Sequence, residues 1–174
     1  NGPSHIFSAV GIDSEITGKN LVVTNDRTDG GNGTFFARTD GKILLEDSEI
    51  TSTEGQVLLW ANNRGVVEGK NLDLDFTKGS AYLGYAIRLD SNGQRLLTDS
   101  ELEVYGEASG FIVSSGATLT LDHTTANVND SGQGGVTLNS SGVSLIMKNN
   151  SSITSDGLGI YAFNGGTFDA GTSQ

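Results

Sequence analysis

The sequence predicts an all-β protein, a single-stranded parallel β-helix of about six to seven rungs that forms one domain over residues 1–174. Three observations lead to this prediction. Apolar residues nowhere follow the 3.6-residue period of an amphipathic helix over ten or more positions. They occur instead in runs of four to six residues, rich in β-branched and aromatic types and bounded by Gly, Asn, Asp and Ser. The third observation is a short pattern that recurs along the chain, as is typical of solenoid proteins.

The recurring pattern has an apolar residue at each end and turn-forming or small polar residues between them. Six copies occur, with the first apolar residue at positions 16, 45, 67, 97, 121 and 147, and the last copy contains one extra residue. One copy fits one rung of a β-helix, because successive copies start 22 to 30 residues apart. The unequal spacing predicts insertions at the corners of rungs, at 24–33 and 77–81.

A second pattern lies between the copies, and consists of a strand followed by a short turn. The turns are Asp40-Gly41, Asn63-Arg64-Gly65, Asn92-Gly93, Ser115-Gly116, Ser141-Gly142 and Asn164-Gly165. Each rung is therefore predicted to hold three short strands: one before this turn, one after it, and one after the small polar position of the first pattern. Each strand should pair in parallel with its counterpart in the next rung, ~4.8 Å away.

Alternation along the strands predicts which side chains point into the core. The expected inward residues before the turn are Phe35, Ala37, Leu59, Ala61, Ile112, Val136 and Leu138. After the turn they are Ile43, Leu45, Leu119, Leu121, Val143, Leu145 and Met147. A shift of one residue in register would turn each of these side chains to the other face, and residues 81–90 fit both registers.

Composition and charge exclude several classes of function. Gly, Ser, Thr and Asn make up 75 of 174 residues, and the net charge is −11. Nucleic acids and anionic membranes are poor partners for such a chain, because Lys and Arg supply most of the affinity for both. The absence of cysteine excludes disulfides, thiolate metal sites and cysteine nucleophiles.

The two patterns together resemble the passenger domains of bacterial autotransporters, in particular the pertactin-like type. In that family a rung reads Gly, three residues, Leu, two residues, Ser or Thr, one residue, Ile, and residues 41–50, 93–102 and 116–126 are near matches. The resemblance implies a right-handed β-helix, here a fragment of a longer passenger. It also implies a protein on the surface of a Gram-negative bacterium, at its outer membrane, or released from it, that acts as an adhesin or other virulence factor.

The resemblance implies a partner as well: a protein or glycan of the host cell surface or extracellular matrix. The open ends of such a solenoid also predict weak self-association, because unpaired strand edges invite pairing. An inert spacer that carries a more distal binding domain is an alternative.

A polysaccharide-degrading lyase or hydrolase is the alternative from another class, because such β-helix enzymes share the fold. Glycoside hydrolysis needs two carboxyl groups at a set separation. Asp47, Asp99 and Asp122 hold similar positions in their rungs, with Glu46 and Glu68 beside them. Acidic residues also favour the tight turns between strands, which accounts for the same positions without any catalysis.

The chain lacks recognisable catalytic motifs. Its only histidines are His5 and His123, and no serine lies in a Gly-x-Ser-x-Gly sequence. Asp122-His123 is similar to part of a pectate-lyase segment, but the Arg-x-x-Pro-x-x-Arg element of that family cannot occur, because Pro3 is the only proline. We therefore expect His123 to be a corner residue, and we expect no catalytic residue, no metal site and no cofactor.

The remaining candidate site is a stripe of outward side chains on the face before the turn. The expected stripe consists of Phe36, Arg38, Leu58, Trp60, Asn62, Phe111, Tyr161 and Phe163. Aromatic residues on a flat face bind sugars or proteins, and exposed apolar patches mark interaction sites. The alternative is that the register is wrong and that these aromatic residues fill the core.

Overall fold

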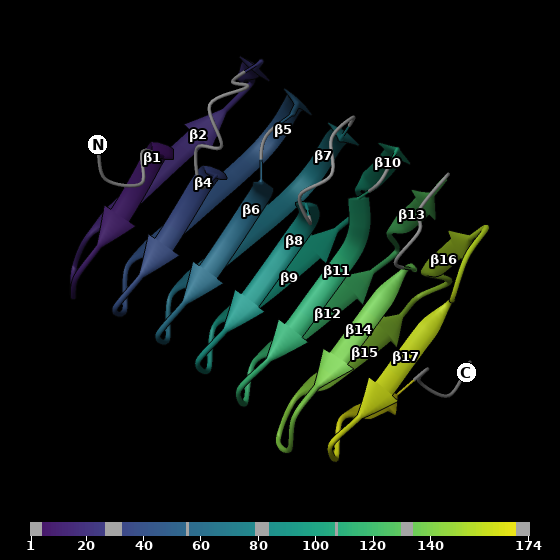
Figure 1. Ribbon diagram of the computed structural model, residues 1–174. Coiled ribbons are helices and arrows are strands. Elements are labelled where there is room, and N and C mark those ends of the chain that lie inside the picture. The colour runs from purple at the N-terminus through teal and green to yellow at the C-terminus, as the bar shows by residue number, and fades with distance from the viewer. Residues whose placement is uncertain are drawn as a thin grey trace.

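The computed structural model describes residues 5–26, 33–54, 56–78, 84–106, 108–129 and 134–169. In this part of the chain every regular element is a β-strand, and the strands pair in parallel. They stack into a β-solenoid of about six turns, with the first rung at one end of the stack and the last at the other (Figure 1). The predicted parallel β-helix is therefore confirmed. The expected insertions at 24–33 and 77–81 fall mostly on 27–32 and 79–83, outside the described residues.

One sheet, called sheet A here, takes one strand from each rung. Its strands, in spatial order, are β1 (His5–Val10), β4 (Gly33–Arg38), β6 (Val57–Asn62), β8 (Gly84–Asp90), β11 (Ala108–Ser114), β14 (Val136–Asn139) and β17 (Ile160–Phe163). The spatial order is the chain order, so each strand lies beside its counterpart from the preceding rung (Figure 1).

The second sheet, sheet B, takes two strand segments from each rung, separated by a bend. The strands before the bend are β2 (Glu15–Lys19), β9 (Gln94–Thr98), β12 (Thr118–Asp122), β15 (Ser144–Lys148) and β18 (Thr167–Asp169). Those after it are β3 (Val22–Asn25), β10 (Glu101–Gly106), β13 (Thr125–Val128) and β16 (Ser152–Ser155). In the second and third rungs, β5 (Lys42–Thr53) and β7 (Val66–Lys78) run through the bend without a break. A complete rung therefore holds three strand segments, as predicted.

A tight turn joins sheet A to sheet B within a rung. In the third rung Asn63 and Arg64 have φ values of 47° and 62°, and the N–H of Gly65 donates to the carbonyl of Asn62 over 2.9 Å. Two successive positive φ values define a type I′ turn, which favours Asn, Asp and Gly. A Cβ at Gly65 would clash with the carbonyl of Ala37 in the preceding rung, so the closeness of the rungs also demands glycine after the turn.

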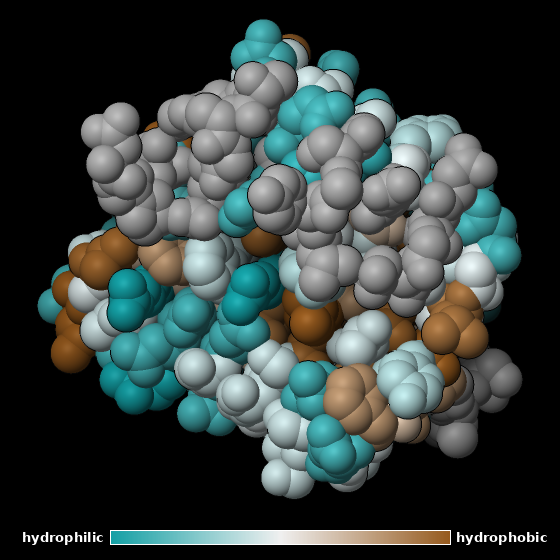
Figure 2. Space-filling view, viewed as in Figure 1, coloured by the Kyte–Doolittle hydropathy of each residue, from teal (hydrophilic) through white to brown (hydrophobic). Residues whose placement is uncertain are grey.

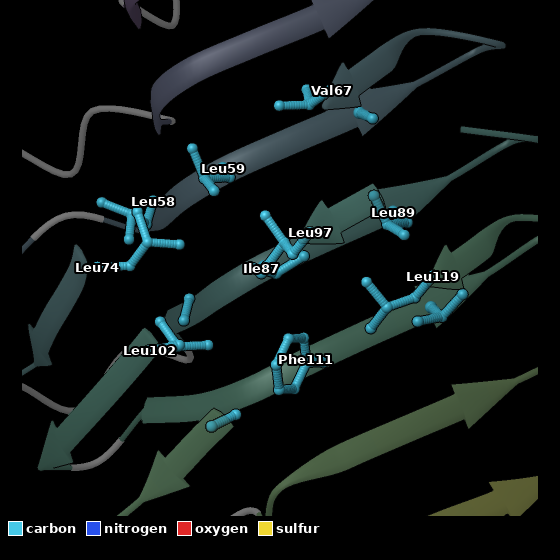
Figure 3. Packing of buried hydrophobic residues seen from close by; sticks show 14 of the residues in the cluster. Leu58, Leu59, Val67, Leu74, Ile87, Leu89, Leu97, Leu102, Phe111 and Leu119 are labelled. Atoms are coloured by element: carbon cyan, nitrogen blue, oxygen red, sulfur yellow. The ribbon is translucent and has the colours of Figure 1, made fainter. Parts of the chain in front are cut away.

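Inward side chains from successive rungs form columns along the solenoid. One column contains Phe35, Leu59, Ile87 and Phe111, none of which is exposed to solvent. Figure 3 shows Leu59, Ile87 and Phe111 among the apolar residues packed between the sheets. The predicted inward residues that are buried are Phe35, Ala37, Ile43, Leu45, Leu59, Ala61, Leu119, Leu121, Val136, Leu138, Val143 and Leu145. Met147 is partly buried and packs against the same core.

The expected register of β11 is wrong by one residue. Phe111 and Val113 are fully buried, whereas Ile112, which was expected inside, faces outward and is partly exposed. Strand pairing establishes the register of β11, because Phe111 aligns with the buried residues Ile87 on one side and Val136 on the other. Three successive apolar residues fit either register, so alternation could not determine which of them face the core.

The core space inside the bend in sheet B is filled by an apolar side chain at one of two alternative positions. Strand pairing aligns Gly18, Leu45, Gly69, Leu97, Leu121 and Met147 just before it. Where Leu stands there, Ser or Thr follows three residues later; where Gly stands there, Leu follows instead. A Cβ on Gly69 would clash with the Leu72 side chain and lie 2.9 Å from that of Leu97. Leu72 therefore fills the space that a Leu before the bend fills in other rungs.

This finding corrects the repeat alignment expected from the sequence. Ile16 and Val67 were expected to match Leu45, but the residues that pair with Leu45 are Gly18 and Gly69, two positions later. The corrected repeat starts at 18, 45, 69, 97, 121 and 147, so that successive rungs are 24 to 28 residues apart.

The two ways of filling the bend should be interchangeable as pairs. Gly69→Leu alone is expected to destabilise by ~1–3 kcal/mol through overpacking. Leu72→Ser alone should destabilise by ~2–5 kcal/mol through a cavity. The double variant reproduces the pattern of the second rung, so we expect it to recover at least ~1 kcal/mol relative to the sum. Urea unfolding of the four proteins tests this, and strictly additive effects would contradict it.

Two charged residues are buried in the described part of the chain, Lys78 and Arg95. Nζ of Lys78 donates to the carbonyl of Glu54 over 3.1 Å, whereas Arg95 has no such partner there. Arg95 aligns with the inward residues Val67 and Leu119 and is 2% exposed. Its three guanidinium nitrogens have no hydrogen-bond partner in the described part of the chain. This burial lowers the pKa of Arg95 to about 9. The fourth rung therefore contains an uncompensated charge.

Candidate functional site

The bend in sheet B carries a row of side chains on left-handed backbone. Asp47, Asn71, Asp99 and His123 take the equivalent position in four successive rungs, with φ values of 50°, 51°, 50° and 48°. Asn, Asp and His adopt this conformation more readily than other residues with a Cβ. The backbone thus explains why these residue types gather at the corners, and His123 is a corner residue as expected.

Side chains of this corner row bind to one another between rungs. The Nδ2 of Asn71 donates to Oδ1 of Asp47 over 2.8 Å, and Nδ1 of His123 lies 2.8 Å from Oδ1 of Asp99. The hydrogen bond from Asn71, followed by that from Lys19, holds the pKa of Asp47 below its ordinary value. Asp47 therefore remains ionised near neutral pH and is suited to a fixed negative charge rather than to proton donation.

An open groove of about 660 Å³ follows the corner row and extends over five rungs. This corner groove is lined by Asp47, Ser48, Glu49, Asn71, Leu72, Asp73, Asp99, Ser100, Glu101, His123, Thr125 and Asn150. The lining contains five carboxylates and one imidazole, and neither Lys nor Arg. The groove is therefore long, polar and strongly anionic.

The carboxylates beside the corner row lie in two parallel ladders on the outer face of sheet B. Glu49, Asp73 and Glu101 align on adjacent strands, and Asp75 and Glu103 align two residues farther along. The pKa of Asp75 is raised, first by burial and then by the negative charges of Asp73, Glu103 and Glu49. This repulsion between neighbouring carboxylates would be relieved by a cation placed over the ladders.

The carboxylates expected from the sequence separate into two groups. Asp47 and Asp99 both line the corner groove, two rungs apart, with Asn71 between them. Asp122 aligns with Thr98 instead, outside the groove lining, and accepts a hydrogen bond of 2.6 Å from Nδ2 of Asn149.

The two glutamates named beside them are not part of the groove lining, and each forms an ion pair with a lysine. Nζ of Lys19 lies 3.1 Å from Glu46 and 3.2 Å from Oδ2 of Asp47, which does line the groove. Glu68 lies 3.6 Å from Nζ of Lys42. Glu46 and Glu68 are thus explained as partners of surface lysines.

The expected stripe divides between the outer face of sheet A and the core. Phe36, Trp60 and Tyr161 lie on one outward row, and Arg38, Asn62 and Phe163 lie on the next. Leu58 and Phe111 do not belong to the stripe, because both are fully buried in the core. In β6 the expected inward residue Leu59 is buried as predicted, but its neighbours Val57 and Leu58 are buried too, so strict alternation does not hold there. In β11 three consecutive apolar residues fit either register.

Two of the three aromatic residues of the outward row, Phe36 and Trp60, are packed against their neighbours. The Phe36 ring lies 4.1 Å from that of His5 and 4.7 Å from that of Trp60, and Phe36 is only 6% exposed. The indole N–H of Trp60 donates to Oδ2 of Asp90 over 3.1 Å, while the guanidinium of Arg88 lies 4.9 Å from its ring centroid. Figure 2 looks onto this side of the molecule, where brown apolar residues appear between hydrophilic ones. Phe36 and Trp60 therefore leave little free aromatic area, whereas Tyr161, at the other end of the row, is 52% exposed.

The sequence reasoning missed Glu49, Asp73 and Glu101 as groove residues. The signal for them is an acidic residue two positions after the corner residue in three successive rungs.

The described residues hold no cluster of His, Asp and Glu suited to a metal ion, and no helix of membrane-spanning length and apolarity occurs in that part of the chain. Comparison with protein-family models, with curated proteins and with solved structures finds no match to any of them.

Proposed function

We propose that this chain is a non-catalytic, adhesin-like β-helix of the autotransporter-passenger type, which binds an extended basic segment of a partner protein in the corner groove. The rung pattern that resembles pertactin-like passengers supports the class and a place at the bacterial surface. The groove supports the mode of binding. Its five carboxylates, contributed by three successive rungs, are the observation that carries the proposal.

Charge complementarity selects the partner. Lys and Arg side chains of an extended segment can each reach a carboxylate while the main chain follows the groove across several rungs. Much of this contact lies near the surface, because Asp73 and Glu101 are exposed. The affinity should therefore fall as salt is added.

Calorimetric titration with an unstructured Lys-rich peptide of about ten residues tests the groove. We expect binding by the wild-type protein, and about tenfold weaker binding by the double variant Asp73→Asn/Glu101→Gln, since each lost contact contributes under ~1 kcal/mol. The matched control is Asp13→Asn/Asp26→Asn, which removes two exposed negative charges in the first rung and should leave the affinity unchanged.

Three results would overturn the proposal. Equal loss in both double variants would mean that the peptide responds to net charge alone. A Glu-rich peptide of the same length that bound equally well would exclude charge complementarity. Tighter binding of a neutral polysaccharide, such as dextran, would mean that the ligand of the groove is a glycan and not a basic peptide.

A second candidate, polysaccharide cleavage, is favoured by one observation: the 2.8 Å contact between His123 and Asp99 within the same groove. A carboxylate that positions an imidazole is a common arrangement in acid–base catalysis. Release of reducing ends or unsaturated products from a panel of polysaccharides, lost in Asp99→Asn, would favour this candidate over the first. A panel without products would exclude it.

A further inference from the structure

The imidazole of His123 is held in the corner groove by a carboxylate of the preceding rung. His123 lines the groove and is exposed, and its Nδ1 lies 2.8 Å from Oδ1 of Asp99. An ionised carboxylate only accepts hydrogen bonds, so Nδ1 carries the hydrogen of this contact. Nε2 is therefore the atom at which a further proton would bind.

The same corner position contains an amide two rungs earlier. Asn71 donates from Nδ2 to Oδ1 of Asp47 over 2.8 Å, and its φ of 51° is close to the 48° of His123. The two pairs thus have the same geometry, but only one of them contains a donor whose charge can change. Imidazole is the side chain that ordinarily gains its charge between about pH 8 and 5, whereas an amide stays neutral.

In the described part of the chain, the ionisable neighbours of His123 are mostly acidic. Asp99 and Glu101 belong to the preceding rung and line the same groove, and Asp122 is the adjacent residue in the chain. Lys148 of the following rung accepts a hydrogen bond of 3.1 Å from the His123 N–H through its main-chain carbonyl, and it aligns with Asp122. A proton on the imidazole would therefore add a positive charge among carboxylates.

We propose that His123 makes binding in the corner groove depend on pH, so that a basic partner segment binds near neutral pH and is released on acidification. This inference rests on the proposed function of the groove. Protonation turns the imidazole into a cation that pairs with Asp99, which occupies one of the five groove carboxylates and places a positive charge beside the ligand. Both changes weaken the attraction for Lys and Arg side chains. Asp47 is unaffected, because its partner Asn71 stays neutral.

His123→Asn is the matched control, because it copies the Asn71 pair and so keeps a donor of constant charge beside Asp99. Calorimetric titration with the Lys-rich peptide is carried out at about pH 7.5 and about pH 5.5. We expect the wild type to bind about fivefold more weakly at the lower pH, since two exposed charge interactions change. His123→Asn should match the wild type at the higher pH and weaken by less than about twofold at the lower.

The reverse substitution, Asn71→His, places a second imidazole beside Asp47 and tests the same idea by a gain. A histidine can adopt the left-handed backbone at this corner, as His123 does in its own rung. We expect the affinity of Asn71→His to fall by about tenfold or more over the same pH range, more steeply than that of the wild type. Far-ultraviolet circular dichroism establishes that both variants keep their β-sheet. Should one of them lose it, the other still provides the comparison with the wild type.

Proton release provides a second measurement. A ligand that binds more tightly when the imidazole is neutral must, by linkage, displace the proton from the charged form. At about pH 6.5, where imidazole is ordinarily half protonated, peptide binding should release more protons from the wild type than from His123→Asn. Calorimetry in two buffers of different ionisation enthalpy measures the difference. His5, the other histidine of the chain, does not line the groove and should not contribute.

The outcomes distinguish this inference from the proposed function. Equal pH dependence and equal proton release in the wild type and His123→Asn would overturn the role of His123 and leave the basic partner in place. Tighter binding by the wild type at the lower pH would do the same. Absence of binding at both pH values would overturn the proposed function, and the pH dependence with it.

Discussion

Leu121→Asp should abolish the fold. Leu121 has no solvent exposure and lies in the core column between Leu97 and Met147. An aspartate there would bury a carboxylate among apolar side chains, at a cost of more than ~4 kcal/mol. Domains of this size are stable by only ~5–15 kcal/mol, and rungs of a solenoid stabilise one another, so a break in the fifth rung should spread to its neighbours. Loss of the β-sheet signal in circular dichroism is the expected observation.

The matched control is Thr120→Asp, one residue earlier in the same strand. Thr120 faces outward and is partly exposed, between Leu96 and Ile146. The new carboxylate can remain in water, so we expect a change below ~1 kcal/mol, as measured by urea unfolding. Leu45→Asp, in the second rung, should behave as Leu121→Asp does, because Leu45 is 3% exposed. Normal melting of both Leu variants would reverse the inward assignment.

The rungs were predictable because their turns restrict residue type. The type I′ turn at Asn63 and Arg64, and the left-handed corner at Asp47, need residues that tolerate positive φ. Such residues recur once per rung, so spacing alone revealed the repeat and the three strands. Apolar alternation between these points then located most of the core.

The corner groove was not predictable for a physical reason. The core space at the bend is filled by Leu45, before the bend, in the second rung and by Leu72, after the bend, in the third. The apolar residue therefore changes its position in the repeat from one rung to the next. Alignment on apolar residues therefore shifts the third rung by two residues and matches Glu49 with Asn71. Strand pairing matches Glu49 with Asp73, which completes the acidic ladder.

The burial of Arg95 could not be predicted from the sequence either. Arg95 precedes two leucines in β9, and either of two registers places one of them in the core. Because arginine is rarely fully buried, the sequence favours the register in which Arg95 is exposed and Leu96 faces the core. In the structure Arg95 pairs with the inward residue Leu119, so Arg95 itself faces the core.

Arg95→Leu should make the protein markedly more stable. The substitution replaces an unpartnered buried guanidinium with an apolar side chain in the column between Val67 and Leu119. Replacing buried charges with apolar groups stabilises other proteins, and a pKa lowered from the ordinary value of arginine to about 9 corresponds to a penalty of a few kcal/mol. We expect a gain of roughly 2–5 kcal/mol in the free energy of unfolding. The control, Arg38→Leu, alters an exposed arginine and should change stability by less than ~0.5 kcal/mol.

The pH dependence of this gain identifies the charge as its cause. Between pH 9 and the higher, ordinary pKa of arginine, the unfolded chain binds the Arg95 proton and the folded chain releases it, so the wild type becomes more stable as pH rises. The advantage of Arg95→Leu should therefore be complete below pH 9 and shrink by ~1.4 kcal/mol per unit above it. Paired urea titrations at pH 7, 9 and 10 measure this, because the other titrating groups are common to both proteins. A stabilisation that did not change with pH would assign the gain to packing, and a loss of stability would mean that the guanidinium finds hydrogen bonds inside the solenoid.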